Sequence, residues 1–279
     1  TNRDGAYNPY AYQTIQQTSS GGGWDFSVIR RINIMLNHLK DGSLNAEETA
    51  HWRSVGYFFH SWWYMELIDR FGDVPYINET LTEESEATYG PRTPRADVAD
   101  SIINRLEYAI AHIGNFDDGD NTLTANAVKA ALSRFLLREG TWAKYHGLNE
   151  PYEKYLKRCM EVSQELMNQY TSLYKGGGTE KEDAAGYGEL WTTESLSGVP
   201  GVIFYKQYYD GLSMHRGSDF EHISAHGVDV PQYSIDLFLM KNGYPIGNPL
   251  SGYKGGEGKD MSETFESRDP RLYQNIQPP

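Results

Sequence analysis

Two histidines in the C-terminal half have a spacing that could hold a metal ion. His222 and His226 lie four residues apart, so a helix would place both imidazoles on one face. Metallohydrolases with this spacing carry a glutamate directly after the first histidine, where this chain has Ile223. Gly227 and Pro231 also disfavour a helix here. The favoured interpretation is a pair of exposed loop histidines, and a metal-dependent hydrolase is the alternative.

A second group of possible metal ligands is the acidic run at residues 117–121. Its sequence, Asp-Asp-Gly-Asp-Asn, concentrates the oxygen ligands that Ca²⁺ prefers. The run lacks the spaced acidic positions and the closing glutamate of an EF-hand loop. Asp, Asn and Gly are also common turn residues, so a solvated turn between two helices is favoured. No cofactor is predicted, with calcium as the alternative.

Other catalytic patterns do not point to an enzyme. The 38 Asp and Glu residues always offer carboxylate pairs, but no motif singles out two of them for glycoside hydrolysis. The glycine runs are not followed by Lys-Ser or Lys-Thr, as a phosphate-binding loop requires, and Gly-x-Ser-x-Gly does not occur. We therefore predict a protein that is not an enzyme, with a glycoside hydrolase as a further alternative.

The charge of the chain excludes other classes of protein. Its 25 Lys and Arg residues against 38 Asp and Glu give a formal net charge of −13 over 279 residues. Nucleic-acid binding and adsorption to anionic lipid both need a basic surface. No run approaches the 18 apolar residues of a membrane span. The single cysteine, Cys159, excludes an internal disulfide.

Aromatic side chains are the residues best suited to ligand binding, and they make up 13% of the chain. A flat ring stacks on the apolar face of a sugar while nearby polar groups bond the hydroxyls. The predicted ligand-binding residues combine loop rings with polar neighbours: Tyr12, Trp24, Asp25, Tyr89, Arg92 and Tyr208. The alternative is that these rings only anchor loops to the core. The rings of residues 57–64 are expected in the core, because that segment is apolar nearly all round.

Helices in the first 175 residues must position these loops. Apolar residues recur there at three- and four-residue spacing, and glycine, proline and capping residues bound the periodic segments. The predicted helices cover residues 25–39, 46–70, 95–113, 125–140 and 151–170. They are expected to form successive antiparallel hairpins, as in helical repeats.

The remaining residues, 176–279, are predicted to be irregular and rich in loops. Glycines punctuate this part, with a strand at 199–209, a short helix at 234–240 and loop from 242 onward. We expect it to pack on the helical part instead of forming its own domain. The predicted fold class is mainly α with little β, in a single domain over residues 1–279.

The most specific motif follows the aromatic helix. Residues 58–75, FFHSWWYMELIDRFGDVP, resemble the SusD/RagB family of outer-membrane nutrient-binding lipoproteins. In that family an aromatic-rich helix ends in Leu-x-x-x-[Phe/Tyr]-Gly-x-Val-Pro, matched here by Leu67, Phe71, Gly72, Val74 and Pro75. Four further segments agree in order: residues 24–39, 91–94, 124–140 and the Arg-Asp-Pro-Arg-Leu motif at 268–272.

This resemblance implies tetratricopeptide-like helical hairpins and a loop-rich half that holds the ligand site. It implies a lipid-anchored protein on the extracellular face of a Gram-negative outer membrane. Such a protein captures glycans, less often peptides, and delivers them to a TonB-dependent SusC-like transporter. Family members are longer and begin at a lipidated cysteine, so the chain is expected to be incomplete at both ends. A peptide- or protein-binding helical scaffold is the remaining alternative.

Overall fold

The computed structural model describes eight segments of the chain: residues 23–114, 116, 118, 121–148, 152–175, 185–208, 230–256 and 258–276, with residues 115, 117, 119, 120 and 257 among the gaps. In these segments the regular structure is helical, with two isolated β-bridges and no strand. The mainly α fold class is therefore confirmed. Contacts divide the chain into two compact units, residues 2–171 and 172–279, and each is described by itself.

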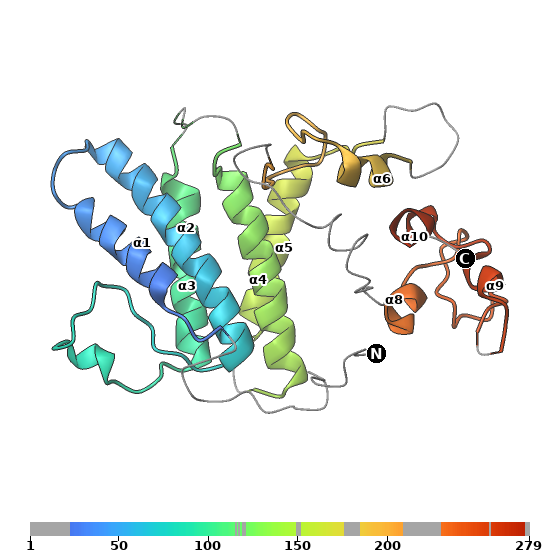
Figure 1. Ribbon diagram of the computed structural model, residues 1–279, viewed down its shortest axis with the longest axis horizontal. Helices are drawn as coiled ribbons and strands as arrows, with labels where there is room; N and C mark the ends of the chain where they lie inside the picture. Colours follow the sequence, from blue (N-terminus) through green and yellow to red (C-terminus); the bar gives the residue numbers. More distant parts are fainter. Residues whose placement is uncertain are drawn as a thin grey trace, which may run out of the picture. The chain divides into compact units, whose positions relative to one another are not determined.

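The first unit is a helical bundle (Figure 1). It contains α1 (Ser27–His38), α2 (Ala46–Phe71), the 3-10 turn η1 (Glu86–Thr88), α3 (Arg95–His112), α4 (Ala125–Tyr145) and α5 (Tyr152–Gln169). Each of the α-helices packs on the next one in the chain, as predicted for successive hairpins. None of the helices in the described segments is both long and apolar enough to cross a bilayer.

The predicted end of α4 at Gly140 is wrong, because the helix continues to Tyr145. A Cβ atom at Gly140 would lie 2.7 Å from Cδ2 of Leu156 on α5. The glycine therefore allows close contact between the two helices and does not end the first of them.

The aromatic run of α2 lies only partly in the core. Phe58 and Tyr64 are buried, but Phe59 and Trp62 are 46% and 45% exposed, and Trp52 is also exposed. The expectation that this whole run is core is therefore wrong. The helices α1 and α3 pack on α2, and a third face of it, with these three rings, lies at the surface of the described bundle.

A buried ion pair joins α3 and α4. Arg95 donates from Nε and Nη2 to the two carboxylate oxygens of Glu139, over 2.9 and 2.7 Å. Its third nitrogen, Nη1, donates to the carbonyl oxygen of Ile68 on α2 over 2.8 Å. The Trp142 ring lies 4.7 Å from the same guanidinium. One side chain thus connects three helices, and both ionic partners are buried.

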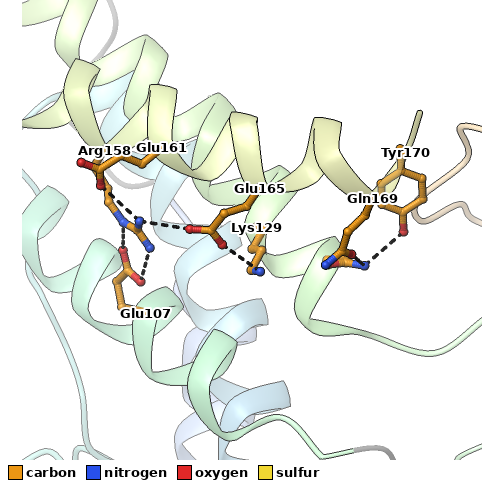
Figure 2. A network of polar contacts seen from close by, with 8 residues as sticks. Glu107, Lys129, Arg158, Glu161, Glu165, Gln169 and Tyr170 are labelled. Atoms are coloured by element: carbon orange, nitrogen blue, oxygen red, sulfur yellow. Dashed lines mark hydrogen bonds and ion pairs between the residues drawn. The ribbon is translucent and has the colours of Figure 1, made fainter. Parts of the chain in front are cut away.

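A second ionic network connects α3, α4 and α5 near the surface (Figure 2). Arg158 donates to both oxygens of Glu107 over 2.6 and 3.0 Å, and it lies 3.4 and 3.6 Å from Glu161 and Glu165. Lys129 on α4 completes the network, 2.9 Å from Glu165. Because these side chains are partly exposed, each pair contributes about 1 kcal/mol or less.

Buried polar groups hold the segment after α2 against the bundle. The Tyr64 hydroxyl donates to the Pro75 carbonyl over 3.0 Å and accepts from the Ile77 amide over 2.7 Å. Asn33 Nδ2 and His60 Nε2 both donate to the Ile77 carbonyl, over 3.2 and 3.0 Å. This segment leads to the loop that carries Tyr89 and Arg92, so its anchoring bears on the predicted site.

The second unit contains α6 (Ala185–Thr192), α8 (Gln232–Asp236), α9 (Met261–Phe265) and α10 (Pro270–Asn275). Its described core consists of Ile235, Phe265 and Leu272, with Phe238 and Ile276 packed against them. Arg268, from the Arg-Asp-Pro-Arg-Leu motif, is fully buried. It donates to the carbonyl oxygens of Thr264, Ile235 and Phe238 over 2.7 to 2.9 Å. The first arginine of the motif therefore holds the short helices together.

Several predictions for this unit are wrong. The described part of the predicted strand, residues 199–208, contains turns and irregular chain and pairs with no other described segment. The helix predicted at 234–240 lies at 232–236, and α6, α9 and α10 were predicted as loop. Five to eight residues are too few for apolar periodicity, and local caps such as Asp260 with Glu263 begin such helices instead. The single-domain organisation stays a prediction.

Removing the buried charge of Glu139 should destabilise the first unit strongly. Glu139→Gln leaves Arg95 charged and buried without its counter-ion, so we expect the free energy of unfolding to fall by about 3 to 5 kcal/mol. Urea unfolding followed by circular dichroism measures this. The control is Glu165→Gln in the exposed network, which should cost about 1 kcal/mol or less. Equal losses in the two variants would contradict the assignment.

His60 should make stability depend on pH. Burial, and next the charge of Arg105, lower its pKa from 6.5 to about 3. The unfolded chain therefore binds a proton that the folded chain does not, and this stabilisation is present above pH 6.5 and is lost as pH falls toward 3. His60→Gln keeps an N–H group for Ile77 but does not titrate. The stability advantage of the wild type over this variant should shrink by about 2 kcal/mol between pH 6.5 and 5 in urea unfolding. Parallel pH curves would show that His60 is not the titrating group.

Candidate ligand-binding site

The structure brings together two of the predicted ligand-binding residues, Trp24 and Arg92. The guanidinium carbon of Arg92 lies 4.7 Å from the centroid of the Trp24 ring, which is a cation–π contact. Arg92 Nη1 also donates to the carbonyl oxygen of Asp73 over 3.4 Å. Trp24 is half-buried and Arg92 is exposed, so the pair lies at the surface of the bundle.

The exit of α2 positions this pair. Gly72, with a φ of 68°, ends the helix and turns the chain, a conformation that favours glycine. Val74 and Thr93 then form an antiparallel bridge, with N–O distances of 3.2 and 2.9 Å, which returns the chain beside the end of α2. Arg92, next to Thr93, is thereby placed over Trp24.

Two phenylalanines hold the Trp24 ring from its sides. Phe71 lies 4.9 Å away at 89°, and Phe26 lies 5.3 Å away at 76°, both edge to face. The sequence did not single them out as site residues. The signal for Phe71 was its place in the Leu-x-x-x-Phe-Gly-x-Val-Pro motif, whose residues 71, 72 and 74 all support the position of Trp24.

Asp25, the residue after Trp24, supplies an exposed carboxylate. Its two oxygens accept from the amide and the hydroxyl of Ser27, each over 2.8 Å, and these hydrogen bonds hold its pKa below the usual value. Its backbone carbonyl accepts from the indole nitrogen of Trp63 over 2.9 Å. The carboxylate is exposed and stays ionised near neutral pH, so a hydroxyl group of a ligand could still donate to it.

Arg70 is a further cation at this place that sequence reasoning missed. A Cβ atom at Gly23 would lie 2.4 Å from Arg70 Nη1, so the arginine occupies the space that the glycine leaves. Gly23 also has a φ of 87°. Two guanidinium groups therefore flank the Trp24 segment, in a chain whose net charge is −13.

The residues described so far form what we call the Trp24 cluster: Trp24, Asp25, Phe26, Arg70, Phe71 and Arg92. The other predicted site residues are not joined to the Trp24 cluster by a described contact. Tyr89 follows η1 and is 78% exposed. Tyr208 belongs to the second unit, is partly exposed and has Lys206 Nζ 4.9 Å from its ring. Tyr12 lies outside the described residues.

The possible metal ligands do not form a site in the part of the chain that the structure describes. Asp118 lies 2.9 Å from Nε2 of the buried His51, so it fixes the turn against α2. No group of three potential metal ligands occurs among the described residues. His222, His226, Asp117 and Asp120 lie outside them.

The Trp24 cluster has the chemistry of a polar binding site. It offers an aromatic ring, guanidinium donors and an ionised carboxylate acceptor. The ring can contact an apolar face of a hydroxyl-rich ligand, and the polar groups can bond its hydroxyls. The only hydroxyl that bonds the Asp25 carboxylate among the described residues, that of Ser27, caps the start of α1 together with the Ser27 amide.

Comparison with known proteins gives a match of part of the chain to a family model, and a shared fold. Residues 11–137 match the SusD-like_3 family model, described as starch-binding and associating with the outer membrane. A search of curated protein sequences gives no match to the chain.

Solved structures of the same fold come from Bacteroides fragilis. A SusD-like protein gives a TM-score of 0.64 at 18% identity, covering 88% of this chain and 46% of its own. A SusD-like carbohydrate-binding protein gives 0.57 at 18% identity, covering 88% and 44%. A SusD superfamily protein gives 0.56 at 14% identity, covering 82% and 43%. The chain thus spans less than half the length of these proteins.

Proposed function

We propose that the chain is a SusD/RagB-like glycan-binding component of an outer-membrane nutrient uptake system. The family description as starch-binding and the carbohydrate-binding protein of the same fold support this class of ligand. Within the chain, the contact between Trp24 and Arg92 carries the proposal. It places a ring and a multiple hydrogen-bond donor, the two groups that sugar recognition needs, side by side.

In this proposal the site binds an oligosaccharide without changing it. The accessible part of the Trp24 ring contacts the apolar face of a sugar. Arg92 donates to its hydroxyl oxygens, and Asp25 accepts from its hydroxyl groups. Tyr89, on the exposed loop between α2 and α3, and Tyr12 are proposed as additional contacts with a longer oligosaccharide. Tyr208 stays a proposed binding residue of the second unit.

The proposal also includes a place and a partner. The bound glycan is delivered to a TonB-dependent SusC-like transporter, and a lipid anchor outside this chain holds the protein on the extracellular face of the outer membrane. The family description, which includes association with the outer membrane, supports the location. The transporter rests on the resemblance to the SusD/RagB family.

A second candidate function is a peptide- or protein-binding scaffold. The row of exposed rings on α2, formed by Trp52, Phe59 and Trp62, favours it, because aromatic side chains are enriched at protein interfaces. This row and the Trp24 cluster can be tested separately.

Trp24→Ala should weaken the binding of maltoheptaose, the probe that the family's starch-binding description suggests. We expect a loss of about tenfold or more in affinity by isothermal titration calorimetry, corresponding to about 1.4 kcal/mol of lost ring contact. Trp24→Phe should lose less, because it keeps a ring. Arg92→Ala should also lose about tenfold, since a charged donor is removed.

Trp62→Ala is the matched control, since it removes an exposed tryptophan from α2 and leaves the Trp24 cluster intact. Its affinity for maltoheptaose should equal that of the wild type. Unchanged binding in both Trp24→Ala and Arg92→Ala would contradict the site. A loss of affinity for maltoheptaose in Trp62→Ala alone would show that the sugar binds to the exposed rings of α2.

A further inference from the structure

We propose that the second unit carries a separate binding site for a neutral saccharide, where α6 meets α10. This inference rests on the proposed glycan-binding function and adds a site in the other unit. Its residues are Tyr187 and Trp191 on α6 and Arg271 and Gln274 on α10, with Asp269 as the residue that positions Arg271.

The two helices are held in contact by a close backbone approach. Gly188 donates from its amide to Oε1 of Gln274 over 2.5 Å, and a Cβ atom at Gly188 would lie 3.0 Å from that same oxygen. Because glycine occupies this position, the backbone of α6 can reach the side chain on α10. The residues beside Gly188 are thereby fixed relative to Arg271 and Gln274.

Two aromatic rings lie on one side of this contact. Tyr187 and Trp191 are four residues apart, so they share a face of α6, and their rings lie 5.9 Å apart at 69°. Trp191 is 70% exposed. An indole this open contributes little to a core, but its free face suits stacking against a pyranose.

A preorganised donor, Arg271, lies on α10 three residues before Gln274. Asp269 accepts from Nε and Nη2 of Arg271 over 3.0 and 2.5 Å, and this pairing holds the pKa of Arg271 above its usual value. Tyr187 directly precedes Gly188, whose amide contacts Gln274, three residues after Arg271. The Arg271 side chain is about half exposed. Its hydrogen bonds to Asp269 use Nε and Nη2 and leave the Nη1 donors unused. They are available to sugar hydroxyls.

The charge balance selects a neutral ligand. The carboxylate of Asp269 neutralises the guanidinium, so the pair can donate hydrogen bonds without attracting an anion strongly. Gln274 holds the junction by accepting from the Gly188 amide, while its Nε2 is buried and has no hydrogen-bond partner among the described residues.

The test uses the full chain and maltotriose, a probe too short to need an extended surface. In a Trp24→Ala/Arg92→Ala background, calorimetry should still show one site per chain. Adding Trp191→Ala should weaken that remaining binding at least tenfold, and adding Trp191→Phe should weaken it by less than about threefold. Adding Trp62→Ala, the matched exposed tryptophan, should leave it unchanged. Trigalacturonate should bind no tighter than maltotriose.

Two results would overturn this inference while leaving the proposed function intact. One is a single wild-type site that is abolished in the Trp24→Ala/Arg92→Ala background. The other is residual binding that Trp191→Ala does not change. If trigalacturonate binds more tightly than maltotriose, the site prefers anions, and the inference of a neutral ligand is wrong. Failure of the wild type to bind maltotriose, together with failure to bind maltoheptaose, would contradict this inference and the proposed function alike.

Discussion

The buried pair of Arg95 and Glu139 is the interaction on which the arrangement of the first unit depends. Arg95 uses its side chain to join α3 to α4 and to the end of α2, while its backbone amide donates to Asp73 over 2.9 Å. The start of α3 is thus fixed to the end of α2 through both the side chain and the backbone amide of Arg95. Arg92 lies three residues before Arg95, so its position over Trp24 is a consequence of this fixation. A surface contact is held in place by a buried charge pair behind it.

The same segment carries the most specific sequence motif and supports the candidate site. Phe71 contacts Trp24, Gly72 turns the chain, and Val74 pairs with Thr93 beside Arg92. These residues touch no ligand in the proposed function, yet they determine where Trp24 and Arg92 lie. A similar division holds in the second unit, where Arg268 binds three carbonyl groups in the core and Arg271 of the same motif lies at the surface.

The long helices could be predicted from the sequence because each repeats its apolar spacing over several turns. The short helices of the second unit have one or two turns, so local caps decide them and periodicity does not. The end of α4 was misplaced because Gly140 is a packing residue, which depends on the position of Leu156 in α5. Likewise, the exposure of Phe59 and Trp62 depends on which helices cover α2, and no local pattern contains that information.

The candidate site shows the same limit. Trp24 and Arg92 could be selected individually as loop residues with suitable chemistry, but their contact depends on the bridge between Val74 and Thr93. The contact also has an energetic consequence. A sugar that stacks on Trp24 must share the ring with Arg92 or displace it, and an exposed cation–π contact is worth about 0.5 to 1 kcal/mol. Trp191 has no such cation over its ring among the described contacts, so a ligand that stacks there displaces no protein group from the ring. Binding at Trp24 therefore includes the cost of displacing a protein group, while binding at Trp191 has mainly the cost of ordering the ligand.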